Sequence, residues 1–217
     1  MKGLLIKDLR LMMAQKTSVL MVLVIGVFLI LSEGDVSFGI GYLTFVGGIF
    51  AMSTMSYDAF ENGMAFLMTL PMRRKVYVLE KYVFIIGASA VLGLLMTALG
   101  LAIFGAGMSV EEIKGIIMTA LVSVVTVAVM MSVMIPIQIH FGPEKSRIVM
   151  IVMAAGVFGL IAVVEKMLSG FQGESAIIRM LSDLRGVQLG IALTVLVAVI
   201  MGISIMISVK LLEKKEY

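Results

Sequence analysis

The chain has 217 residues, of which 61% are hydrophobic and 14% are charged, and its mean hydropathy is +1.14. A soluble domain of this size is nearer half apolar and a quarter charged, so the excess apolar surface must face something other than water. The sequence has no Cys and one His, which excludes disulfides, Cys-ligated metal sites and a His-based metal site within one chain. Composition therefore predicts an all-α polytopic integral membrane protein, with one transmembrane domain over residues 1–217.

Six hydrophobic segments are candidates to cross the bilayer as helices. A hydrocarbon core of about 30 Å needs about 20 apolar residues in helical conformation. Two of the segments, the first and the fifth, are short, so we expect Lys16 and Arg147 beside them to reach the membrane interface by snorkelling. The predicted spans cover residues 18–32, 36–57, 82–107, 115–139, 148–164 and 187–209.

Basic residues are distributed unequally between the two sides that six spans define. The side with both termini carries 13 of the 17 Lys and Arg residues: Lys2, Lys7, Arg10, Lys16, Arg73, Arg74, Lys75, Lys81, Lys145, Arg147, Lys210, Lys214 and Lys215. The other side carries four: Lys114, Lys166, Arg179 and Arg185. Because cytoplasmic loops are enriched in Lys and Arg, we expect a multi-pass protein of the plasma membrane with both termini in the cytoplasm. No small-residue cleavage site follows Leu31, so we do not expect a signal peptide.

The interiors of the third to sixth predicted spans have essentially no charged residue. Ion-coupled carriers usually place a carboxylate, His or basic residue inside the membrane, so this absence argues against a proton-driven pump. Small residues recur four apart, a spacing that lets helices pack closely, although such rows also line substrate paths. These residues are Ser89, Gly93 and Thr97, then Ala155 and Gly159, and finally Ala198 and Gly202.

Methionine is abundant, with 21 residues, and Met130 and Met134 have a spacing that aligns thioethers for copper(I). Adaptable apolar packing is the favoured interpretation of the same residues, because Met fills irregular gaps and repacks easily.

Enzyme motifs are incomplete or absent. Glu111 and Glu112 resemble the start of an intramembrane metalloprotease motif but lack two His residues to hold zinc, and Ser89 lacks a nucleophile-elbow context. The single His140 lies at a predicted cytoplasmic end of a span, and no Walker A sequence is present. We therefore expect no catalytic residue, metal or cofactor in this chain and no nucleic-acid partner. ATP and Mg²⁺, if used, would be bound by another polypeptide.

The N-terminal segment, residues 1–15, is predicted to be an amphipathic helix at the membrane interface, basic enough to lie on anionic lipid. A simple cytoplasmic extension of the first span is the alternative. On a helical wheel one arc is apolar and the opposite side is basic; the apolar residues are Leu5, Ile6, Leu9, Met12 and Met13, and the basic ones are Lys7 and Arg10.

Residues 58–81 are too polar to span a membrane and too apolar for a solvated linker. Pro71 ends an apolar stretch, and Asp58 and Glu61 suit the first turn of a helix over 58–70. Such a helix needs a partner surface, with lipid as the alternative cover, because exposed apolar patches are unfavourable in water. Its apolar residues are Phe60, Met64, Phe66, Leu67 and Leu70, and the basic run Arg73, Arg74 and Lys75 follows.

Three groups of segments together resemble the permease subunits of type II, export-type ABC transporters. They are residues 1–9, then 56–58 with 69–75 and 80–82, and finally Pro136 with 141–147. Within that group, the chain is most similar to small bacterial permeases related to the exporter of phenol-soluble modulins, which are amphipathic helical peptides.

The resemblance implies a six-helix permease that works as a dimer, with a second copy or a related permease, and with separate ABC-type ATPase subunits. It makes residues 58–70 the coupling helix that docks in the ATPase and 167–185 an extracellular helical segment. It also implies a second cytoplasmic loop with Phe141, Gly142, Glu144, Lys145 and Arg147. The function expected is ATP-driven export of amphipathic peptides or other lipophilic compounds.

Two other classes of protein stay open at this stage. One is the substrate-binding membrane module of a vitamin-uptake transporter, which needs a deep polar pocket that the spans supply poorly. The other is a structural or immunity-type membrane protein that binds a partner without transport.

Overall fold

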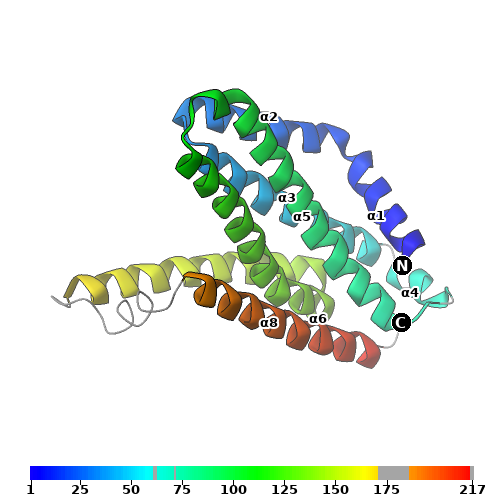
Figure 1. Ribbon diagram of the computed structural model, residues 1–217. Coiled ribbons are helices and arrows are strands. Elements are labelled where there is room, and N and C mark those ends of the chain that lie inside the picture. Colours follow the sequence, from blue (N-terminus) through cyan, green and yellow to red (C-terminus); the bar gives the residue numbers. More distant parts are fainter. Residues whose placement is uncertain (61–62, 71, 171–185, 216–217) are drawn as a thin grey trace.

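The computed structural model describes residues 1–217 except 61–62, 71, 171–185 and 216–217. The described residues form helices and no strand (Figure 1). The helices are α1 (Lys2–Ala14), α2 (Lys16–Glu33), α3 (Val36–Ala59), α4 (Gly63–Thr69), α5 (Arg74–Phe104), the 3-10 turn η2 (Gly105–Gly107), α6 (Val110–Gly170) and α8 (Gly186–Lys214).

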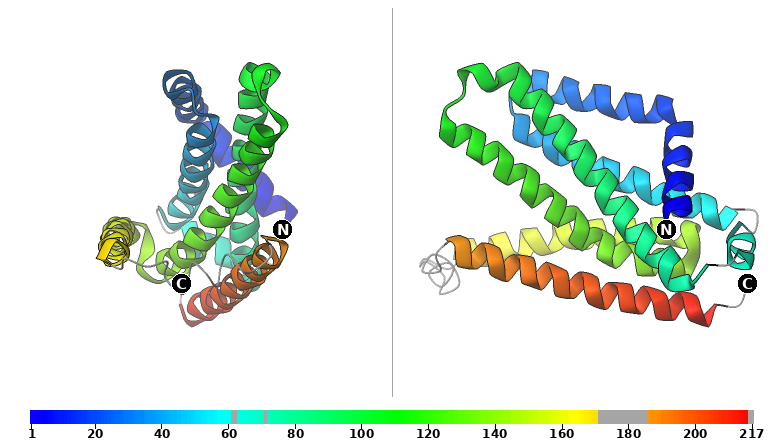
Figure 2. Two further views of the ribbon diagram at one scale, coloured as in Figure 1. Left: turned by 60° about the vertical axis from the view of Figure 1, so that its left-hand side comes forward. Right: turned by 45° about the vertical axis from the view of Figure 1, so that its right-hand side comes forward.

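Helix α3 lies at the centre of the bundle, where it packs most extensively against α5 and also contacts α6 and α2. Helix α8 packs along α6 and touches α5. Figures 1 and 2 show both termini and α4 at the same end of the bundle. We call this the terminal end, which comprises residues 1–8, 58–81, 138–145 and 209–215 in the described part of the chain.

Four helices among the described residues are long and apolar enough to cross a membrane. Helices α1 and α2 meet at a bend of 71°, and counting this bent pair as one span gives five. The predicted span at 148–164 lies in the second half of α6, where most side chains are outside the described set, and most of the segment 167–185 also lies outside it. The structure therefore supports a multi-pass helical membrane protein with four to five spans, and the predicted count of six is not confirmed. The candidate spans are Val36–Ala59, Arg74–Gly107, Val110–Pro143 and Thr194–Lys214.

The connection between α3 and α5 differs from the single helix predicted over 58–70. Helix α3 continues to Ala59, so Asp58 belongs to the last turn of α3, and Phe60 then has extended backbone angles of φ −74° and ψ 143°. The shorter helix α4 begins only at Gly63, and α5 begins at Arg74 rather than at residue 82. The polarity of this stretch predicted a longer non-spanning connection. In the structure its charges Asp58 and Lys81 pair with residues that are distant in sequence, so α3 and α5 extend into it.

Helix α3 and helix α5 approach closely through small residues. A Cβ atom on Gly93 would lie 2.3 Å from Thr44 Oγ1, and one on Gly48 would lie 2.9 Å from a methyl of Val127 in α6. Ser89 and Thr97 are buried on the same helix as Gly93. Any larger side chain at Gly93 would force α3 and α5 apart, which fixes the register of the two helices.

The other predicted packing residues are placed differently. Ala198 and Gly202 are exposed on α8, and nothing lies within 4 Å of a Cβ built on Gly202, so this row does not pack against the part of the chain that the structure describes. Helix α8 turns a different face inward, on which Ser204, Ser208 and Leu212 recur four residues apart. The side chains of Ala155 and Gly159 lie outside the described set.

Methionine side chains help to fill the core at the terminal end. Met134 is buried there beside Met131 and Met55, and Met130 packs against the edge of the same cluster. These positions agree with the packing interpretation of the M-x-x-x-M pair.

Gly142 breaks α6 into two helical segments, where the sequence predicted a second cytoplasmic loop. Its backbone angles are φ +80° and ψ 176°, a combination that essentially only glycine adopts. Pro143 follows directly, at a position that suits the start of a new helix. Figures 1 and 2 show the second segment, in yellow, running back from the terminal end. The side chains of Glu144 and Arg147 lie outside the described set.

Gly142→Ala should destabilise the fold by roughly 1–3 kcal/mol, because a Cβ atom strains this backbone conformation even where space is open. Gly87→Ala is the matched control: Gly87 is also free of neighbours within 4 Å, and its helical φ accepts alanine. Denaturant unfolding of both variants in detergent measures the difference. Equal stability of the two variants would contradict the strain at Gly142.

Candidate functional site

Four charged side chains from three helices meet at the terminal end. Lys7 and Asp8 lie on α1, Asp58 on α3 and Lys81 on α5, and we call these four residues the charge cluster. Lys81 Nζ is 2.7 Å from Asp58 Oδ2 and directly contacts Asp8, while Lys7 Nζ is 3.1 Å from Asp8 Oδ1 and directly contacts Asp58. Each ammonium group thus contacts both carboxylates.

Neutral groups complete the surroundings of the charge cluster. The Tyr77 hydroxyl donates a hydrogen bond of 3.0 Å to Asp58 Oδ2, and the Thr54 hydroxyl donates one of 3.2 Å to Asp8 Oδ2. Lys81 Nζ also lies 3.3 Å from Thr54 Oγ1 and 5.3 Å from the centre of the Tyr77 ring. These contacts supply donors and a π face where water would otherwise solvate the charges.

Burial makes the pairing obligatory. Asp8 and Lys81 are fully buried and Asp58 is nearly so, while the Lys7 side chain is 29% exposed. Removing an ion from water costs several kcal/mol even in a real protein, and only a close partner offsets that cost. Helix α1 is therefore held to α3 and α5 by charges that cannot be separated cheaply.

Helix α4 has one face in the core and one outside. Leu67 is only 8% exposed and belongs to the core at the terminal end, with Met64 and Met68 beside it. Phe66 is 68% exposed, and Leu70, one turn later, is exposed with it. The sequence had assigned Phe66 and Leu67 to the same outer surface, but the structure separates them because adjacent helical positions point about 100° apart. The rest of the predicted surface includes Phe60, which is exposed, and Glu61 and Pro71, which lie outside the described residues.

The basic run after α4 is also divided. The guanidinium of Arg74 donates hydrogen bonds of 3.0 Å and 2.7 Å to the backbone carbonyls of Leu212 and Glu213 at the end of α8. A cation at a helix C-terminus satisfies carbonyls that lack an intrahelical donor. Arg73 and Lys75 are exposed. Arg74 therefore anchors α8 to α5, and its two neighbours stay available at the surface.

A second polar contact joins α5, α6 and α8 deeper in the bundle. The Tyr82 hydroxyl lies 2.5 Å from Ser204 Oγ and 3.1 Å from Ser208 Oγ. Ser204 in turn donates a hydrogen bond to the carbonyl of Ser132. Buried hydroxyls need such partners in an apolar interior, so these bonds fix the position of α8.

Of the predicted second cytoplasmic loop, Phe141 and Lys145 are exposed, and Phe141 packs edge-on against His140 with ring centroids 4.6 Å apart. At the opposite end of the bundle Glu112 has a structural role. Its carboxylate accepts a hydrogen bond of 2.6 Å from the Ser109 backbone N–H, and the Ser109 hydroxyl accepts from the Glu112 N–H, which is a capping box at the start of α6.

The charge cluster was missed by reasoning from the sequence. Lys7 was expected on an outward basic face, Asp58 at the start of a helix, and Lys81 in a loop. The available signal was that each charge stands beside apolar residues in one of the segments carrying the family resemblance. No local pattern shows that these charges pair.

The helices and the buried charges define a multi-pass α-helical membrane protein whose helices are tied together at one end by ion pairs. The family model described as ABC-2 family transporter protein matches residues 3–213. The chain belongs to this family, which implies a permease of an ABC transporter, a membrane environment and an ATPase partner. Comparison with curated proteins and with solved structures gives no match.

Lys81→Met should lower the free energy of unfolding by roughly 3–5 kcal/mol, because it leaves two buried aspartates with one ammonium group between them. Lys114→Met is the control. Lys114 pairs with Glu111 on the surface, where both side chains are mostly exposed, so little change is expected. Denaturant unfolding in detergent measures both variants, and equal stability would show that the cluster does not hold the helices together.

Proposed function

We propose that this chain is the membrane permease of an ATP-driven exporter and that the outer face of α4 is the surface on which the ATPase subunit docks. The observation that carries the proposal is the exposure of Phe60, Phe66 and Leu70 at the end of the bundle that bears both termini. Large exposed apolar side chains on the membrane-spanning helices are covered by lipid. Phe66 on α4 and the flanking Phe60 and Leu70 lie beyond the spans, and a protein surface would cover them.

The attachment of α4 supports a role in transmitting force. Leu67 inserts into the core, and Asp58 at the end of α3, just before α4, belongs to the charge cluster. A displacement of α4 by the ATPase would therefore act on α3, α5 and α1 together. In the proposed cycle, ATP binding by the partner closes a dimer of permeases and switches access through the interface between them. ATP and Mg²⁺ belong to the partner in this scheme.

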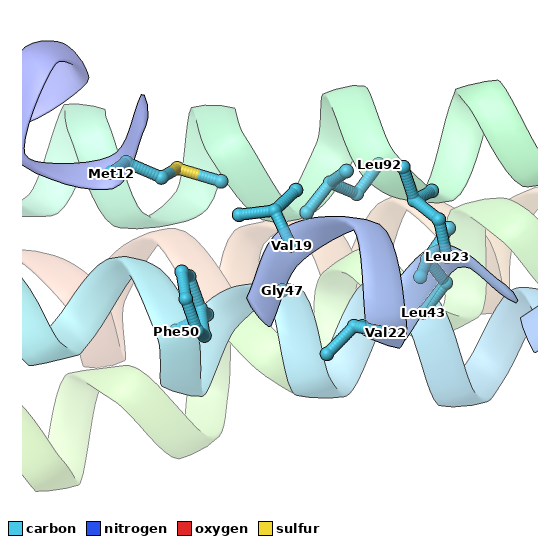
Figure 3. Close-up of a pocket in the computed structure, with 8 residues that line it drawn as sticks. All are labelled: Met12, Val19, Val22, Leu23, Leu43, Gly47, Phe50 and Leu92. Atoms are coloured by element: carbon cyan, nitrogen blue, oxygen red, sulfur yellow. The ribbon is translucent and has the colours of Figure 1, made fainter. Parts of the chain in front are cut away.

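The vitamin-uptake alternative finds no support in the cavity at the α1–α2 bend (Figure 3). Eight apolar residues line it: Met12, Val19, Val22, Leu23, Leu43, Gly47, Phe50 and Leu92. Its volume is about 10 Å³, near the least that holds one water molecule. It is a small apolar gap between helices and lacks the polar groups that recognise a vitamin.

Phe66→Ala should weaken binding of the ATPase on the order of tenfold or more, since truncating an aromatic anchor commonly costs 2 kcal/mol or more. Phe28→Ala is the matched control, because Phe28 is 65% exposed but lies on the membrane-spanning α2. Affinity is measured by titrating the ATPase onto the permease in nanodiscs. Leu67→Ala should instead lower stability, as expected for a core residue. Unchanged binding by Phe66→Ala would indicate that α4 lies on lipid.

The proposed orientation places both termini and α4 in the cytoplasm, in line with the excess of basic residues on that side. Because the chain has no native Cys, single cysteines report the side directly. Ala106→Cys, exposed in η2 at the far end, should react with an impermeant maleimide added to intact cells. Lys214→Cys should react only after the membrane is opened. The reverse pattern would invert the topology and the proposed position of the ATPase.

The proposed cargo is an amphipathic peptide or another lipophilic compound. Spans without fixed charge offer little to recognise a small ion, whereas Met-rich surfaces repack around a greasy partner. With its ATPase in proteoliposomes, the permease should show ATP turnover stimulated several-fold by an amphipathic helical peptide. A scrambled, non-amphipathic peptide of the same composition is the control. Equal stimulation by both peptides would rule out recognition of the amphipathic shape.

A further inference from the structure

Glu80 is a buried carboxyl group that the charge cluster does not use. It lies on α5 next to Lys81 and is 0% exposed. Neither of its carboxyl oxygens has a hydrogen-bond partner in the part of the chain that the structure describes. A bare carboxylate in such a place would lose its solvation and gain nothing in return.

The neighbouring charges are already balanced without Glu80. Lys7 and Lys81 supply two positive charges, and Asp8 and Asp58 supply two negative ones in direct contact with them. Adjacent positions on a helix do not face each other, so Lys81 points to the aspartates rather than to Glu80. An ionised Glu80 would be a fifth charge with no ion pair of its own among the described residues.

The three buried acids differ in their hydrogen-bond partners. Asp58 accepts a hydrogen bond from Tyr77 as well as contacts from both lysines, and Asp8 accepts from Thr54 and Lys81. Glu80 has no such donor among the described residues, and a buried carboxyl without donors favours the neutral form. Among the described residues no group of three or more His, Cys, Asp or Glu side chains is placed to hold a metal ion.

We propose that Glu80 is a proton-binding site, occupied below neutral pH, and that its proton keeps the charge cluster intact so that α1 stays on α3 and α5. Loss of the proton creates a buried negative charge that Asp8 and Asp58 repel and that attracts Lys81 and Lys7, the two lysines that the aspartates share. Burial opposes this charge most, and its attraction for the lysines competes with their pairs to the aspartates. The attachment of α1 is therefore firm at low pH and weakens as the pH rises past the loss of this proton.

Release of α1 from α3 and α5 would also affect α2, the helix that follows it. Helix α1 joins α2 at the 71° bend, and α2 packs on α3. A released α1 would no longer hold the beginning of α2 against the bundle. The inference is independent of the cargo and of the ATPase, because it concerns groups within this chain alone.

Infrared difference spectroscopy of the purified permease tests the proton directly. At mildly acidic pH the spectrum should contain the C=O band of a protonated carboxylic acid, and this band should be lost in Glu80→Gln. Glu111→Gln, which changes an exposed carboxylate, should leave the band in place. Persistence of the band in Glu80→Gln, or its loss in Asp8→Asn alone, would overturn the assignment, as would an absent band at mildly acidic pH.

Hydrogen exchange tests the attachment of α1. After correction for the intrinsic pH dependence, exchange of the α1 amides should accelerate on the order of tenfold in the wild type as the pH is raised, because one pH unit of proton linkage corresponds to a tenfold change. Glu80→Gln, which keeps the neutral shape, should show no such acceleration. Parallel behaviour of the two proteins would refute the role of the Glu80 proton, and protection of α1 by added Na⁺ at high pH would indicate a cation site instead.

Discussion

Lys81 has a buried ammonium group in contact with Asp8 and Asp58, and the arrangement of the terminal end depends on these contacts. An unpaired charge in this position would cost several kcal/mol, so α5 can occupy its place only if α1 and the end of α3 are also in place. The three helices are therefore interdependent. Lys7, which is partly exposed on α1, contacts both aspartates as well. It therefore also ties the position of α1 to that of Asp58 on α3.

The two ends of the bundle are held by different physical means. Toward the far end, α3 and α5 touch through small residues such as Gly93, where the Thr44 side chain lies against the glycine and leaves no room for a Cβ atom. At the terminal end, ion pairs and hydroxyls hold the helices, and charged contacts are the kind that a proton or a partner protein can shift. A permease in the proposed cycle needs both, because a rigid bundle must respond at the end where the ATPase docks.

Helix α4 connects these contacts to the outside. Its inner residue, Leu67, shares a core with Tyr77, and the Tyr77 hydroxyl bonds to Asp58. Its outer residue, Phe66, is exposed. Two layers of contacts thus connect the proposed docking face on α4 with α1, which is distant in sequence. In the proposed scheme, a movement of the ATPase bound at Phe66 would be transmitted through α4 to the charge cluster.

The sequence by itself determined the helical membrane class and most of the approximate positions of the spans, because lipid burial is a property of local composition. Its charge bias predicts the side of the membrane on which both termini lie. It did not determine that α5 begins at Arg74 or that Asp58 lies in the last turn of α3, and these features depend on Lys81 meeting Asp8 and Asp58. It also did not determine that Leu67 packs in the core while Phe66, about 100° away on α4, is exposed. Only the tertiary structure decided them. A charged residue predicts a loop when the sequence is considered locally, whereas folding places its counter-ion, which is far away in sequence, beside it.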